Sequence, residues 1–192
     1  MNQADAFLAF YTLLLGLGVA ALLTGLAGTM RQHRLREIGW AGALLAILIV
    51  FEFLTAWSGA ARGFRSADAH VIDLFLPLGT GACYFVAATL LFPDPADVGR
   101  EGHIRAYVGG QVRTVAAMLL AANVLLIVQE APDTVARMAR NPAYLATFYL
   151  PYNGAILLSY AAMMAAPRRR VAVAAMAVLL AIYLWVTFIR HL

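Results

Sequence analysis

The sequence predicts an all-α fold, a bundle of six transmembrane helices forming one domain over residues 1–192. Of the 192 residues, 63% are hydrophobic and 12% are charged, whereas soluble domains are about half apolar and about one-quarter charged. The apolar residues gather in six runs of about 20, the length that crosses a hydrocarbon core of roughly 30 Å. Backbone groups in lipid must bond internally, so these runs are predicted to be helices; barrel strands would be half as long and would alternate.

The first predicted helix begins a few residues into the sequence. Its flank MNQAD contains an acid and no arginine, and its apolar stretch is too long for the core of a signal sequence, so we expect no cleaved signal peptide. The six helices are expected at residues 6–27, 38–57, 71–92, 107–128, 143–165 and 171–189.

Prolines and an asparagine mark several helix ends. Pro93 and Pro95 stop the third helix, because proline cannot continue the backbone hydrogen bonding of a helix. Asn141 is a favourable N-cap, and Pro142 at the next position opens the fifth helix. Pro167 closes the fifth helix, and three arginines then form a very tight turn into the sixth.

The loop arginines predict the orientation of the chain. Eight lie in the first, third and fifth loops: Arg31, Arg34, Arg36, Arg100, Arg105, Arg168, Arg169 and Arg170. Five lie in the second and fourth loops and the tail: Arg62, Arg65, Arg137, Arg140 and Arg190. The positive-inside rule therefore predicts cytoplasmic odd loops and periplasmic termini. The abundance of Ala, Leu, Val, Gly and Arg suggests a bacterial inner membrane, and the arginines give no sign of nucleic-acid binding.

Two helical segments, 76–93 and 150–167, align without a gap. LPLGTGACYFVAATLLFP and LPYNGAILLSYAAMMAAP share Leu-Pro at the start, Ala-Ala in the middle and Pro at the end. The even-numbered helices share Leu-Leu-Ala at 44–46, 119–121 and 179–181. These matches predict three tandem two-helix hairpins related by an axis along the membrane normal. Shared membrane composition is the alternative explanation.

The odd-numbered helices are expected to pack through small residues, which let backbones approach closely in lipid. Such residues share one face of the first and third helices: Gly18, Ala21, Gly25 and Gly28, then Gly79, Cys83 and Ala87. The even-numbered helices are bulkier, and we expect them to face lipid or a neighbouring subunit.

Six polar residues inside predicted helices are candidates for a pore or solute-binding site: Glu52, Asp73, Asn123, Tyr152, Asn153 and Tyr183. Glu52 is the most specific of them, because it is the one ionisable residue between Trp40 and Trp57. A charge at a helix centre costs about 2.5–3.5 kcal/mol on insertion scales, so Glu52 is expected to face protein, near Asp73 and Asn123. It is either protonated or paired with Arg62, and a purely structural hydrogen bond is the alternative to a functional role.

Two of the other candidates also have simpler explanations. Asp73 lies in the first turn of its helix, where an acid suits the helix dipole. Pro151 removes a backbone hydrogen bond and Gly154 adds conformational freedom. The freed carbonyls and Asn153 then either line a cavity or belong to a packing kink.

Several kinds of site are not expected. The histidines lie in loops or at helix ends: His33, His70, His103 and His191. No two of them are placed to bind a haem between helices, and no group of His, Cys and acids has the spacing of a metal site. The sequence has neither a nucleophilic serine motif nor a phosphate loop. We therefore predict no metal, no cofactor, no catalytic residue and no enzymatic activity.

The first 60 residues carry a family resemblance. The segment LLLGLGVAALLTGLA (13–27), a short arginine-bearing loop and Trp40 at the start of the second helix resemble a family of short bacterial multi-pass membrane proteins with no assigned function. Three tandem hairpins are also similar in architecture to the urea/amide channels, which form oligomeric rings with a pore in each subunit. The chain departs from that family in lacking its Trp-rich fifth helix and His-bearing outer loop, so no site residues are carried over.

These observations predict a polytopic inner-membrane protein that forms a pore or carrier path for a small solute or ion. The alternative is an accessory or assembly subunit of a larger membrane complex, because the loops are short and no strong catalytic site is present. The expected partners are the lipid bilayer and either further copies of the chain or other membrane subunits.

Overall fold

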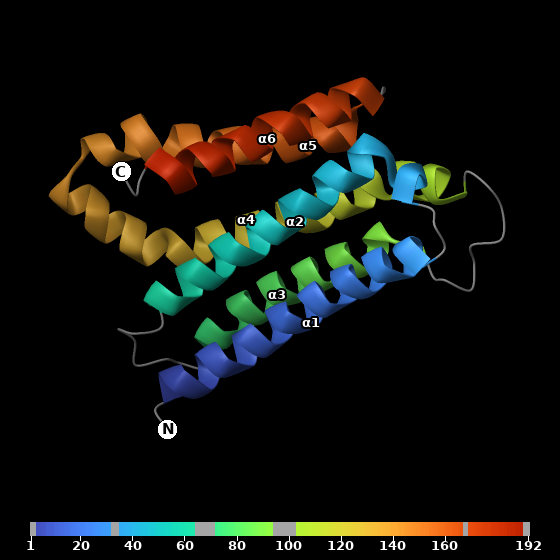
Figure 1. Cartoon of the computed structure of the whole chain (residues 1–192). Coiled ribbons are helices and arrows are strands. Elements are labelled where there is room, and N and C mark those ends of the chain that lie inside the picture. Colours follow the sequence, from blue (N-terminus) through green and yellow to red (C-terminus); the bar gives the residue numbers. More distant parts are fainter. Residues whose placement is uncertain (1–2, 32–34, 64–71, 94–102, 167–168, 190–192) are drawn as a thin grey trace.

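The computed structural model describes residues 3–31, 35–63, 72–93, 103–166 and 169–189, and within these ranges it contains helices and no strand. The elements are α1 (Gln3–Arg31), α2 (Leu35–Gly63), α3 (Ile72–Leu91), α4 (His103–Arg140), the π-helical turn η2 (Leu145–Tyr149), α5 (Leu150–Ala165) and α6 (Arg169–Ile189). Successive α-helices run in opposite directions, so α1 begins and α6 ends at the same end of the bundle (Figure 1).

Four helices are long and apolar enough to cross a membrane. The spans are Leu8–Arg31, Arg36–Ala60, Ile104–Arg140 and Arg169–Thr187. The apolar part of α3, Phe75–Leu91, is shorter, and η2 divides the fifth predicted span. The all-helical prediction with six helices is thus confirmed, and the four long apolar helices indicate a membrane-embedded protein.

Helix α4 differs most from its predicted bounds. The sequence predicts 107–128, whereas the helix runs from His103 to Arg140 and contains Pro132. The predicted bounds come from a run of apolar residues about as long as a bilayer is thick. Such a run ends where polar residues begin, even if the helix continues. The additional turns at the C-terminal end are mostly exposed and carry Arg137 and Arg140.

Two other helices are irregular where glycine or proline disturbs them. At Gly39 the φ angle is +64°, which kinks α2 directly after the predicted start of the helix at Ile38. Pro151 lacks an N–H, and its ring clashes with the carbonyl four residues before it in a regular helix. The turn that precedes Pro151 is accordingly widened into η2, where the N–H of Leu150 donates to the carbonyl of Leu145.

Helices α2 and α4 occupy the middle of the bundle. Helix α1 packs against α3 on one side, α5 packs against α6 on the other, and α2 contacts α1, α3, α4 and α6 (Figure 1). The expectation that even-numbered helices face lipid or another subunit is therefore wrong for α2 and α4, whose apolar segments are more buried than those of α1 and α6. Their bulky side chains fill the interior instead.

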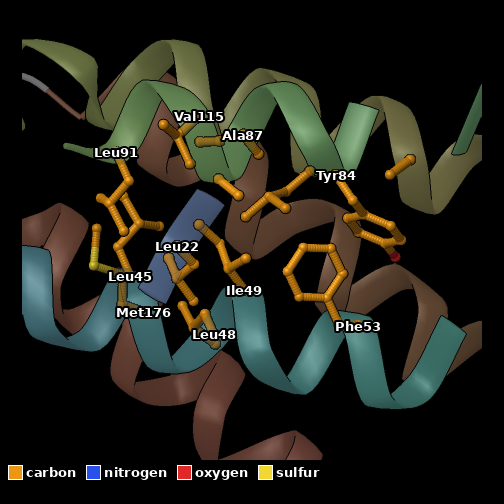
Figure 2. Packing of buried hydrophobic residues seen from close by; sticks show 14 of the residues in the cluster. Leu22, Leu45, Leu48, Ile49, Phe53, Tyr84, Ala87, Leu91, Val115 and Met176 are labelled. Carbon is orange, nitrogen blue, oxygen red and sulfur yellow. The ribbon is translucent and has the colours of Figure 1, made fainter. Parts of the chain in front are cut away.

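The core forms where large residues of α2 meet small or branched residues of its neighbours. Leu45, Leu48 and Ile49 are completely buried, and Figure 2 shows them facing Leu22 of α1 and Ala87 of α3. Large side chains of α2 thus fill the space that small residues of its neighbours leave, which places α2 inside the bundle.

Two glycines of α1 show how closely the helices approach. A Cβ atom added at Gly18 would lie 2.5 Å from the ring of Phe53, and one added at Gly25 would lie 2.5 Å from the ring of Phe92. Real Cβ contacts are never this short, so both aromatic rings occupy space that only glycine leaves open. The predicted close packing of α1 through small residues is confirmed at these two positions.

Candidate functional site

The carboxylate of Glu52 lies at the centre of the bundle. Glu52 is on α2 and has 0% of its surface exposed. The hydroxyl of Tyr84 donates to Oε2 over 2.8 Å, and Nδ2 of Asn123 donates to Oε1 over 3.0 Å. The hydroxyls of Tyr160 and Tyr183 also donate to Oε1. We call these five residues the Glu52 cluster.

Each member of the Glu52 cluster comes from a different helix. Tyr84 lies on α3, Asn123 on α4, Tyr160 on α5 and Tyr183 on α6. Five of the helices therefore meet at one carboxylate.

Neighbouring side chains orient the donors. The ring of Tyr84 meets Phe53 edge to face, with ring centroids 5.6 Å apart (Figure 2). The ring of Tyr183 stacks on Phe51 with centroids 6.3 Å apart. Asn123 also donates to the carbonyl of Leu119, one turn earlier on its own helix, over 2.9 Å. Residues on both sides of Glu52 in α2 therefore hold two of its tyrosine partners by aromatic contact.

The donor set matches the chemistry of an ionised carboxylate. Such a group only accepts hydrogen bonds and has about two lone-pair sites on each oxygen, so the four donors equal its total capacity, although the three on Oε1 exceed the capacity of that atom. Burying a charge in an apolar interior is costly unless hydrogen bonds replace its hydration. Three donors gather on Oε1 and one on Oε2, and every partner in this set is neutral.

The structure brings together three of the six residues that the sequence singled out. Glu52, Asn123 and Tyr183 are in the cluster, and Tyr152 lies close enough to Tyr183 to interact with it electrostatically. The ring of Tyr152 also stacks on Phe148 of η2, with ring centroids 5.5 Å apart.

The other two candidates are not seen at the carboxylate. Nδ2 of Asn153 donates to the carbonyl of Tyr149 over 3.0 Å, which ties the side chain to its own helix beside η2. Asp73 lies in the first turn of α3, and its side chain is outside the described residues. The side chain of Arg62, considered as an ion-pair partner of Glu52, is also outside them. The hydrogen-bond partners described for Glu52 are neutral.

The sequence interpretation missed Tyr84 and Tyr160. Both are completely buried, although tyrosine in membrane proteins is usually found at the interface with water. A phenol in the middle of an apolar helix needs a hydrogen-bond partner, and Glu52 is the one carboxylate within its own apolar run. The sequence signal for the contact was therefore the presence of phenols in some apolar helices and of a carboxylate in another, each needing a hydrogen-bond partner.

No metal site accompanies the cluster in the part of the chain that the structure describes, where no three His, Cys, Asp or Glu residues gather. The chain matches no protein-family model, no curated protein and no solved structure at a significant level.

Proposed function

We propose that the protein is a membrane carrier for a small ion or solute and that Glu52 binds and releases a proton during transport. The observation that supports this is the identity of its partners: three tyrosine hydroxyls and one amide surround a fully buried carboxylate. Ionisable residues inside membranes commonly mark ion pathways and proton relays.

Tyrosine suits such a role because its hydroxyl can either donate or accept a hydrogen bond. When Glu52 is ionised, the phenols donate to it. When Glu52 takes up a proton, its new O–H group becomes a donor, and one phenol can turn to accept that bond. An arginine or lysine partner offers only donors and would favour the ionised form alone. The cluster can thus hold Glu52 in both protonation states.

The arrangement corresponds to an occluded state of a carrier. The carboxylate is fully buried and is bonded by side chains of α3 to α6. Transport then requires the helices to part at one side of the cluster at a time. In this proposal the odd loops face the cytoplasm, both termini face the periplasm of a bacterial inner membrane, and the chain has no catalytic step. The three-hairpin repeat and the family likeness in the first 60 residues stay predictions.

Proton flux into liposomes tests the proposal. The purified protein is reconstituted in vesicles that contain a pH-sensitive dye, and a potassium diffusion potential drives protons inward. We expect flux above that of protein-free vesicles in the wild type and no such flux in Glu52→Gln. Glu130→Gln is the matched control, because it makes the same change at an exposed carboxylate on α4. Wild-type flux that is unchanged in Glu52→Gln would contradict the proposal.

The second candidate is an accessory or assembly subunit. It is supported by the number of hydrogen bonds around Glu52. A carboxylate that joins five helices in this way needs no role beyond holding them together. The mass and composition of the particle purified from its own host in mild detergent separate the two roles. Stoichiometric foreign chains would favour the subunit, and a particle of this chain alone, as a monomer or homo-oligomer, would favour the carrier.

A further inference from the structure

Two open grooves meet at the end of the bundle where α2, α4 and α6 begin. They measure about 470 and 720 Å³, and both are lined by Gly39, Trp40 and Arg105. Trp40 stands between them and is 83% exposed. The grooves thus adjoin at these three residues, and one of the three is an exposed indole ring.

The linings of the grooves are apolar away from this point. Leu26, Ile38 and Phe92 line the smaller groove, and Val173, Ala174 and Ala177 line the larger one. Arg105 lines both grooves, Arg36 lines the smaller one, and Arg169 and Arg170 line the larger one. No acidic residue is among the described lining residues, so the charged side chains that line the grooves are all positive, and the rest of each lining is mostly apolar.

The kink at Gly39 brings two of these charges together. A Cβ atom added at Gly39 would lie 3.1 Å from Nη2 of Arg169 and 3.8 Å from Nε of Arg105. Two guanidinium groups therefore approach within 4 Å of one point. Arg105 is further tethered there by donating to the carbonyl of Arg36 over 3.4 Å. Like charges held this close repel each other, and an anion between them removes that repulsion.

We propose that this junction binds an anionic phospholipid. Its phosphate lies between Arg105 and Arg169, and its two acyl chains follow the two grooves on either side of Trp40. Guanidinium groups match phosphate oxygens in geometry, tryptophan prefers the level of the headgroups, and basic clefts between membrane helices bind anionic headgroups. An acidic peptide would satisfy the arginines and leave both apolar branches unfilled. The site is separate from the Glu52 cluster, none of whose members lines either groove.

Lipid binding to the purified full chain in mild detergent tests this proposal. Phosphatidylglycerol and phosphatidylcholine with identical acyl chains are titrated separately, and bound lipid is counted by native mass spectrometry. We expect tighter binding of phosphatidylglycerol. Because a surface arginine contributes about fivefold to the binding of anionic lipid, Arg105→Gln combined with Arg169→Gln should weaken it by about 25-fold. Arg137→Gln combined with Arg140→Gln, at the opposite end of α4, is the matched control and should change little (Figure 1).

A second variant tests the apolar half of the site without altering charge. Ala174→Trp places a large side chain in the groove beside α6 and should weaken phosphatidylglycerol binding while the helical circular dichroism spectrum is retained. Equal binding of the two lipids, an equal loss in the control pair, or binding of inorganic phosphate as tight as that of the lipid would overturn the proposal.

Discussion

Removing single hydroxyls from the Glu52 cluster should have unequal effects on stability, because the two oxygens of the carboxylate accept different numbers of hydrogen bonds. Tyr84 is the one described donor to Oε2, whereas Oε1 accepts from Asn123, Tyr160 and Tyr183. Tyr84→Phe therefore leaves Oε2 buried without a described partner. Tyr160→Phe and Tyr183→Phe each leave two donors on Oε1, which matches its two lone pairs.

The magnitudes follow from this difference. A hydrogen bond to a charged group contributes about 1.5–3 kcal/mol, and a buried acceptor left alone costs about 1–3 kcal/mol. We expect Tyr84→Phe to lower the free energy of unfolding by about 2 kcal/mol. Removal of a redundant donor should cost no more than an average side-chain hydrogen bond between membrane helices, about 0.6 kcal/mol.

Unfolding in mixed micelles measures these free energies. The protein is titrated with a denaturing detergent, and its helicity is followed by circular dichroism. All three variants remove one oxygen atom from a completely buried ring, so each serves as the size-matched control for the others. A loss for Tyr160→Phe or Tyr183→Phe as large as that for Tyr84→Phe would refute the reasoning.

Two further pairs of substitutions test packing and the limits of the site. Gly18→Ala should lower the free energy of unfolding by about 1–3 kcal/mol, because its Cβ would clash with Phe53. The Cβ of Gly16→Ala meets nothing within 4 Å, so this control should cause no such loss. Equal effects of the two variants in the same unfolding assay would contradict the packing. Asn123→Ala should alter proton flux because it removes a donor to the carboxylate. Asn153→Ala should leave flux unchanged because its described hydrogen bond goes to the nearby carbonyl of Tyr149 and not to Glu52. The flux assay in liposomes decides between them, and a loss in Asn153→Ala would show that the site extends into α5.

Hydropathy and helix-end signals were sufficient to predict the helices. Six apolar runs correspond to the six helices, and in the described part of the chain four of these helices are long and apolar enough to cross a membrane. The polar extension of α4 to Arg140 lay beyond this signal, and so did the kink at Gly39. Both depend on contacts or backbone angles that composition does not encode.

The centre of the site was only partly accessible from sequence. The energetic cost of a lipid-exposed carboxylate was enough to predict that Glu52 faces protein and lies near Asn123. Which helices surround it depends on the packing order, and the bulky α2 was expected outside the bundle rather than at its middle. Tyr84 and Tyr160 were consequently not associated with Glu52, although an unpartnered phenol in an apolar helix is itself a signal.

Infrared spectroscopy of Glu52 tests the central proposal, proton exchange at the buried carboxyl, most directly. Spectra of the wild type and of Glu52→Gln are compared across a range of pH, and the carboxylic acid carbonyl band that disappears in the variant belongs to Glu52. Proton exchange predicts that this band grows as pH falls and fades as pH rises. A Glu52 band of constant intensity, or no assignable band at any pH, would show that the carboxyl keeps one protonation state and would leave it only a structural role.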